Sequence, residues 1–199
     1  MDTANRVVVL SGPTQDCGKT LVSTSLASIV AQAGQRVLFV DADMRKGYVH
    51  NVFRLNNHRG LSCVLDGTVG WQEAVQRFEK GGFDVLTCGP QPTHPVDLLM
   101  SERFQDVMAQ IEKRYDIVII DTPPVLAVTD ALLIARAAAT TLLVARFGKT
   151  SVKEIETSLK RMERMNVKVN GVILNDIVKS AALYYNSGYS AYDYGYTRE

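Results

Sequence analysis

The segment from Gly12 to Thr20 has the residue types of a phosphate-binding loop. It stands between a β-branched apolar run and a helical pattern, and it ends in Gly18-Lys19-Thr20. In such a loop, backbone N–H groups at the start of the helix cradle phosphate, the lysine reaches the β- and γ-phosphate oxygens, and the hydroxyl ligates Mg²⁺. The fit to G-x-x-x-x-G-K-[ST] is imperfect, because Gly12 lies one residue too early. Taken alone, the segment could equally be a glycine turn with a surface lysine.

Three aspartates follow two further apolar runs. Asp41 and Asp43 come after VLFV, and Asp121 comes after IVII. Because ligands sit at the carboxyl ends of strands in a parallel sheet, these carboxylates should converge on the phosphate-binding loop. Mg²⁺ is the natural cation there, since one or two carboxylates plus substrate oxygens and water suffice to hold it. A single Asp at such a place is often only a helix cap or a turn former, but three of them favour the metal site.

The elements that must position these residues alternate along the chain. Apolar runs of strand length without period-2 alternation predict strands buried on both faces, as in a parallel sheet. They fall at residues 6–10, 36–40, 83–86, 116–120, 140–145 and 169–174. Helical patterns lie at residues 18–33, 101–114, 129–138 and 151–165, the last opening with a Ser151/Glu154 capping box. Residues 47–82 indicate loops plus short helices. The order predicts a doubly wound α/β fold, a mostly parallel sheet sandwiched by helices.

The end of the chain is unusual in composition. Six of the eight tyrosines follow Lys179: Tyr184, Tyr185, Tyr189, Tyr192, Tyr194 and Tyr196. We therefore divide the chain into an ATP-binding domain, residues 1–179, and a mobile tyrosine-rich tail, residues 180–199, because the tail has no apolar period. A sticky aromatic edge or an aggregation-prone terminus is the alternative. Beside an ATP site, tyrosine hydroxyls on a solvated segment become candidate phosphoryl acceptors.

Composition excludes several classes of protein. The chain has 199 residues, 46% of them hydrophobic and 22% charged, with a formal net charge of +1. The charge gives no case for nucleic acid or an anionic membrane as the main partner. Three widely spaced cysteines predict neither a disulfide framework nor a zinc site. With no membrane-length apolar run and no signal peptide, the chain is expected to be cytoplasmic.

Taken together, these motifs resemble a known family. The loop Gly12 to Thr20, VLFVDADMR (37–45), IVIIDTPP (117–124) and the tyrosine-rich tail look like the cytoplasmic kinase domain of bacterial tyrosine kinases (BY-kinases) of capsule and exopolysaccharide export, in particular the Wzc-like branch. The resemblance implies a P-loop nucleotide-hydrolase fold of MinD/ParA type and a kinase that uses ATP and Mg²⁺.

The resemblance also implies roles for individual residues. Lys19, Asp41 and Asp43 would be catalytic, and Mg²⁺ would be held by Thr20, Asp41, Asp43 and Asp121. The nucleotide would be bound by Gly12, Asp16, Cys17, Gly18, Lys19, Thr20, Leu21 and Asn175, the last at a position that resembles the adenine-reading one of MinD and ParA. Cys17 could tune the loop by oxidation, although a packing role is favoured. Tyr48 and the six tail tyrosines would accept phosphate; a half-buried loop aromatic is an equal interpretation of Tyr48.

The partners implied by the family are neighbouring subunits of a homo-oligomeric ring that phosphorylate one another, a protein-tyrosine phosphatase and the polysaccharide export machinery. The parent protein would sit in the bacterial inner membrane through a region preceding this chain. Two other functions stay open: a MinD/ParA-like positioning ATPase, disfavoured because Thr14 occupies the place of that group's signature lysine, and a non-catalytic, ATP-gated assembly module whose tail docks partners.

Overall fold

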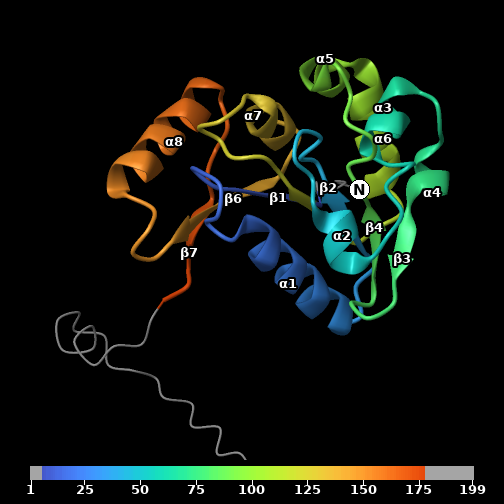
Figure 1. The fold of residues 1–199 in the computed structure, drawn as a ribbon, viewed down its shortest axis with the longest axis horizontal. Coiled ribbons are helices and arrows are strands. Elements are labelled where there is room, and N and C mark those ends of the chain that lie inside the picture. The colour runs from blue at the N-terminus through green and yellow to red at the C-terminus, as the bar shows by residue number, and fades with distance from the viewer. Residues whose placement is uncertain (1–5, 178–199) are drawn as a thin grey trace, which may run out of the picture.

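The computed structural model describes residues 6–177 (Figure 1). The predicted boundary at residue 179, the tail and its six tyrosines lie outside the described residues. Among the described residues, no helix has the length and apolarity needed to cross a membrane.

Seven strands form one sheet, in the order β3-β4-β2-β5-β1-β6-β7. All neighbours are parallel except β3, which runs antiparallel to β4. The strands are β1 (Val7–Ser11), β2 (Val37–Asp41), β3 (Gln76–Phe78), β4 (Phe83–Leu86), β5 (Ile117–Asp121), β6 (Thr140–Arg146) and β7 (Gly171–Asn175). β1 and β2 both pair with β5, so the carboxyl ends of these three strands meet at one edge of the sheet.

Helices cover both faces of the sheet (Figure 1). α1 (Lys19–Gln32) and α2 (Val49–Phe53) pack on one face, and the remaining helices pack on the other. These are α3 (Leu61–Asp66), α4 (Trp71–Ala74), α5 (Pro95–Met100), α6 (Glu102–Glu112), α7 (Asp130–Ala135) and α8 (Val152–Arg164).

Burial on both faces explains the continuous apolar runs in the sequence. In β1, Val7 and Val9 join the core under α3 to α8, whereas Leu10 joins the core under α1. In β2, Leu38 and Val40 face the core under α3 to α8, and Phe39 faces the core under α1 and α2. Successive side chains of a strand point to opposite faces, so every position must be apolar when both faces are covered.

The doubly wound α/β fold and its mostly parallel sheet agree with the sequence prediction. All six predicted strands and all four predicted helices are present, with ends shifted by a few residues. The Ser151/Glu154 capping box is also present. The short strand β3 and the helix α5 were not predicted, and α7 spans only part of the helix expected over residues 129–138.

Candidate active site

The loop between β1 and α1 has the backbone of an anion cradle. Gly18, at the N-cap of α1, has φ 89°, and Asp16 has φ 61°. Left-handed residues next to right-handed ones turn successive N–H groups toward one concave point, and the helix dipole adds partial positive charge there. The loop therefore offers amide donors at the N-terminus of a long helix, as phosphate binding requires.

Cys17 packs inside this loop. Its side chain is buried, and its thiol donates to the Thr14 carbonyl at 3.4 Å. A Cβ added at Gly12 would collide with the Cys17 sulfur and lie 2.8 Å from the Val144 carbonyl oxygen, so only glycine fits there. Burial raises the pKa of the Cys17 thiol, which keeps it protonated and unreactive. This environment favours the packing role over a redox role.

Lys19 and Thr20 begin α1 and face the end of β5. Lys19 is only 9% exposed, and within residues 6–177 it forms no ion pair. The Thr20 hydroxyl donates to Asp121 Oδ2 at 2.6 Å. Asp121 Oδ1 is buried and has no hydrogen-bond partner among the described residues. A buried ammonium beside an unsatisfied carboxylate oxygen is costly unless a ligand completes both.

Asp41 lies directly beside Asp121, because the two residues are paired in the β2–β5 register. Asp41 is buried and accepts backbone N–H groups from Asp43 at 3.2 Å and from Val49 at 3.3 Å. Burial, with the charge of Asp121, raises the pKa of Asp41 to about 8. Burial likewise raises the pKa of Asp121 to about 6, although the Thr20 hydroxyl and Lys19 oppose the shift.

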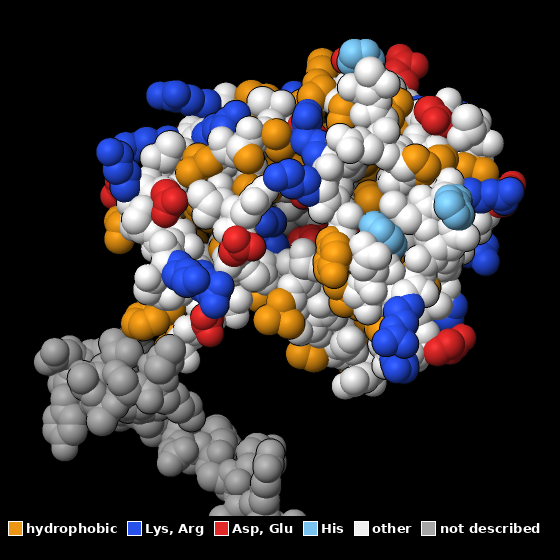
Figure 2. Space-filling model, viewed as in Figure 1, with side chains coloured by type: hydrophobic (Ala, Val, Ile, Leu, Met, Phe, Trp, Pro, Cys, Tyr) orange, Lys and Arg blue, Asp and Glu red, His pale blue; other side chains and the backbone are white. Residues whose placement is uncertain are grey.

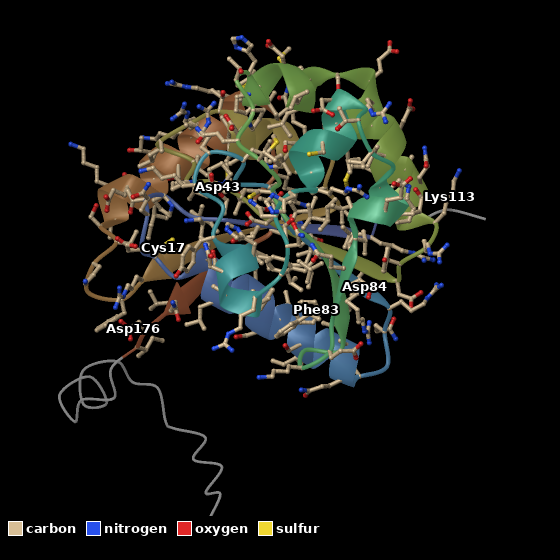
Figure 3. All side chains as sticks on the ribbon, turned by 45° about the vertical axis from the view of Figure 1, so that its right-hand side comes forward. Cys17, Asp43, Phe83, Asp84, Lys113 and Asp176 are labelled. Atoms are coloured by element: carbon tan, nitrogen blue, oxygen red, sulfur yellow. The ribbon has the colours of Figure 1, made fainter. Side chains whose placement is uncertain are left out.

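Asp43 is half-buried and shapes the turn that follows β2. Its Oδ1 accepts the N–H groups of Arg45 at 3.2 Å and Lys46 at 2.9 Å. Figure 3 places Asp43 and Cys17 on the same side of the molecule, and Figure 2 shows a hollow near the middle of one face, above α1, where basic and acidic side chains lie side by side.

The oxygen donors at this edge of the sheet fit Mg²⁺. Thr20 supplies a hydroxyl, and Asp41 and Asp121 supply adjacent buried carboxylates with raised pKa values. Among the described residues no three His, Cys, Asp or Glu side chains form a cluster able to hold a metal. Mg²⁺ itself needs only one or two carboxylates, because waters and phosphate oxygens complete its shell.

The end of β7 braces the loop from the other side. Asn175 donates to the Cys17 carbonyl at 3.2 Å, and its amide lies where a Cβ of Gly18 would be. Arg146, at the end of β6, pairs with Asp176 at 2.8 Å and donates to the Asp16 carbonyl at 3.3 Å. Sequence reasoning missed Arg146 and Asp176, which carry no motif. Leu21, in the first turn of α1, is 65% exposed.

Tyr48 caps the short helix α2 and is 64% exposed, so it is not the half-buried aromatic of the alternative interpretation. Its chain neighbours lie against Asp41. Val49 donates its N–H to Asp41 Oδ2, and a Cβ added at Gly47 would lie 2.8 Å from the same oxygen. Tyr48 is the only predicted acceptor among the described residues, and its neighbours on both sides in the chain contact Asp41.

Arg45 has a partner that the sequence did not reveal. Its guanidinium binds both carboxylate oxygens of Asp130, at 2.9 and 3.1 Å. The Asp130 side chain is fully buried at the first residue of α7, whereas that of Arg45 is 36% exposed. The pair fixes the turn that carries Asp43.

Comparisons with known proteins show what this chain resembles. Residues 6–174 match the family described as an AAA domain. The tyrosine-protein kinase etk of Escherichia coli K12 is 46% identical over 186 residues, which cover 94% of this chain and 26% of the relative. The chain thus spans about a quarter of that relative's length. The solved kinase domain of Escherichia coli tyrosine kinase ETK has a TM-score of 0.88 and 45% identity, covering 100% of this chain and 75% of that one.

A more distant solved structure shows the fold alone. The septum site-determining protein MinD of Pyrococcus horikoshii, complexed with Mg-ADP, has a TM-score of 0.74 at 20% identity, covering 88% of this chain and 72% of that one. The chain thus shares its fold with MinD.

Proposed function

The chain belongs to the kinase domains of the bacterial tyrosine kinases, within the AAA domain family, and on this premise we propose that it transfers the γ-phosphoryl group of ATP to tyrosine hydroxyls of its own C-terminal cluster. One observation carries the proposal: at the N-terminus of α1, the buried Lys19 lies next to Thr20, whose hydroxyl donates to Asp121 at the end of β5. Phosphoryl transfer asks little covalent work of a protein, only alignment and neutralisation of charge.

Each residue of the site has a role that its position supports. The loop amides and Lys19 bind the β- and γ-phosphates, because both offer fixed positive charge at one point. Thr20, Asp41, Asp43 and Asp121 would hold Mg²⁺, one or two of the carboxylates directly and the rest through water, and the bound ion would neutralise phosphate charge. Asn175, with Gly12, Asp16, Cys17, Gly18 and Leu21, completes the nucleotide-binding set, and Asn175 reads adenine.

A carboxylate accepts the proton of the attacking tyrosine. A free tyrosine hydroxyl titrates near pH ~10, so it needs an acceptor within hydrogen-bond reach as the bond to phosphorus forms. Asp41 is the best candidate, because its carboxylate ends β2 in register with Asp121, whose side chain accepts from Thr20 at the start of α1. Asp43, two residues later on the same turn, is the second candidate.

The acceptors are the tail tyrosines Tyr184, Tyr185, Tyr189, Tyr192, Tyr194 and Tyr196, with Tyr48 as an additional internal site. Exposure of the Tyr48 side chain and the contact of its neighbour Val49 with Asp41 support the internal site. The partners that we propose are neighbouring copies in a homo-oligomeric ring, a protein-tyrosine phosphatase and a polysaccharide export apparatus, with the parent protein in the bacterial inner membrane.

Blotting with an anti-phosphotyrosine antibody tests the proposal. The wild-type chain expressed in bacteria is expected to be labelled. In Lys19→Met the rate of tyrosine phosphorylation is expected to fall by a factor of about 10²–10³, because a fixed positive charge on the transferring phosphoryl group is lost. Lys160→Met, which removes an exposed lysine of α8, is the matched control and should keep the label. Wild-type labelling of Lys19→Met, with an unchanged melting temperature, would refute the assignment.

A further inference from the structure

A cavity of about 890 Å³ lies at the other end of the sheet from the phosphate-binding loop. Three residues that line it lie at the amino ends of strands. Arg36 directly precedes β2, Tyr115 lies just before β5, and Asp84 lies near the start of β4. These strands are parallel, so their amino ends lie at the edge opposite Asp41 and Asp121. Figure 3 shows Lys113 and Asp84 on one side of the molecule and Cys17 and Asp176 on the other. The cavity is thus separate from the proposed active site.

Positive charge is in excess around this cavity. Four cations and one carboxylate line it: Arg36, Arg77, Lys113, Arg114 and Asp84. Arg77 pairs with Asp84 at 3.1 Å, and Arg36 pairs at 2.8 Å with Asp116, which Arg6 also approaches at 3.9 Å.

Two of the cations remain available. Lys113 and Arg114 are exposed, and in the part of the chain that the structure describes neither forms an ion pair. They follow the C-terminus of α6 next to each other, so they present two positive charges at one rim of the cavity. A dianionic group such as a phosphate monoester is the ligand that this arrangement attracts.

The cavity also has a rigid aromatic wall. Trp71 and Tyr115 both line it and contact each other edge to face, with ring centroids 6.4 Å apart. Their polar atoms are already used, because Trp71 Nε1 donates to Gln110 at 3.1 Å and the Tyr115 hydroxyl donates to Asp84 at 2.9 Å. Trp71 and Tyr115 are each only 6% exposed, so the wall offers a small apolar surface beside the charged rim. A ligand that carries both a ring and a phosphate matches these two parts of the cavity.

We propose that this cavity binds a phosphotyrosine side chain of the segment 180–199 of this protein. The proposal rests on the proposed kinase function, which supplies the phosphotyrosine. The segment holds six tyrosines but only Asp193, Arg198 and Glu199 as charged side chains. Each phosphate adds about −1.5 to −2 charges, so the segment becomes complementary to Lys113 and Arg114 only after phosphorylation.

Chain length permits the contact. Twenty-two residues follow Ile177, and at ~3.3 Å per residue they span up to roughly 73 Å. The seven strands of the sheet, at ~4.8 Å spacing, are only roughly 29 Å across. The segment can thus pass from the β7 edge to the cavity of its own chain or of a neighbouring copy. Docking there would hold the phosphorylated product away from the nucleotide site and leave that site open to unmodified tyrosines.

Trp71 provides the reporter for a test, because it is the single tryptophan of the chain and lies on the cavity wall. A synthetic peptide of residues 180–199 carrying phosphotyrosine at position 192 is titrated into the 199-residue Lys19→Met chain. The variant lacks the phosphate-site lysine, and the peptide carries its phosphate whether or not the protein is a kinase. Failure of the kinase assignment and failure of the docking site are therefore separate results. Binding is followed by Trp71 fluorescence and by calorimetry.

The phosphopeptide is expected to change Trp71 emission, and Lys113→Gln/Arg114→Gln is expected to weaken its binding by at least about tenfold, as loss of charge-assisted contacts does. Lys160→Gln/Arg164→Gln, which removes two exposed cations of α8, should bind as before, and melting temperatures check that all variants are folded. Free phosphotyrosine should compete, and inorganic phosphate at the same concentration should not. The proposal is overturned if the unmodified peptide binds equally well, if the Lys113/Arg114 variant binds normally, or if inorganic phosphate competes as well as phosphotyrosine.

Discussion

Asp41 occupies a position where its charge opposes folding of the ligand-free chain. Its carboxylate is buried beside that of Asp121, and both pKa values are raised. Two buried carboxylates side by side do not stabilise the fold, because burial and mutual repulsion both disfavour their charged forms. Groups with pKa values shifted in this way cluster at functional sites. Binding of Mg²⁺ and phosphate, as proposed above, would recover the free energy that these charges cost in the absence of ligand.

The pH dependence of stability follows from this shift. The pKa of Asp41 is about 8 in the folded protein against 3.8 for a free side chain, so the folded state binds the proton more tightly than the unfolded state. The free energy of unfolding should therefore fall as pH rises through this window, by at most about 1.4 kcal/mol per pH unit for one proton. Asp41→Asn cannot titrate and should lose this part of the slope.

Denaturant unfolding of the metal-free protein at a series of pH values measures the slope. Wild type should lose stability relative to Asp41→Asn between about pH 5 and pH 8, and added Mg²⁺ should reduce the difference by binding the charged form. Parallel profiles for the two proteins, with or without Mg²⁺, would contradict a buried titrating Asp41.

Among the elements, those with a continuous apolar signal were predictable. The strands of the sheet are covered on both faces, and a helix such as α6 shows its apolar stripe in Phe104, Val107, Met108 and Ile111. The three-residue strand β3 is half-exposed and too short for a periodic signal. The six-residue helix α5 offered only Pro95 at its start, a weak indication of a helix N-terminus.

The ion pair between Arg45 and Asp130 joins the turn after β2 to the start of α7. Asp130→Ala leaves the Arg45 guanidinium without its buried partner, and we expect the free energy of unfolding to fall by about 1–3 kcal/mol. This range is below that of a fully buried pair because the side chain of Arg45 is 36% exposed. Denaturant titration measures the loss, and a double-mutant cycle with Arg45→Ala isolates the pair.

The Arg36–Asp116 pair is the matched control, since it is also bidentate but exposed. Asp116→Ala should destabilise the protein less than Asp130→Ala, because water screens the exposed pair. Equal losses for the two variants would show that the Arg45–Asp130 pair does not fix the turn.

For the whole molecule, the sheet topology decides how much of the site the sequence could predict. Asp41 and Asp121 were expected to meet because both end parallel strands, and β2 and β5 are indeed neighbours in register. Contacts between Arg45 and Asp130, 85 residues apart, or between Arg146 and Asp16, 130 residues apart, depend on loop paths that no local pattern encodes. The strand pattern therefore predicted which carboxylates meet at the sheet edge, and the structure was needed to find the side chains that hold the surrounding loops in place.

Transfer between copies is a prediction about the assembled molecule. A Lys19→Met chain with intact tyrosines is mixed with an active chain whose six tail tyrosines are Phe, under MgATP, at several concentrations. If one copy phosphorylates another, mass spectrometry should find phosphate on the Lys19→Met tail, at a rate that rises faster than linearly with total protein. An unmodified Lys19→Met tail, beside wild type that labels itself at a concentration-independent specific rate, would mean that transfer is intramolecular.

The fate of the γ-phosphate tests the central claim most directly, because a tyrosine kinase and a positioning ATPase of the same fold deliver it to different places. The purified chain is incubated with Mg²⁺ and ATP labelled in the γ-phosphoryl group, and the label is divided between phosphotyrosine and inorganic phosphate. We predict label on tyrosine, chiefly between residues 184 and 196 with a further site at Tyr48, and none in Lys19→Met. Label released wholly as inorganic phosphate by the folded wild-type chain, with no phosphotyrosine, would contradict the account.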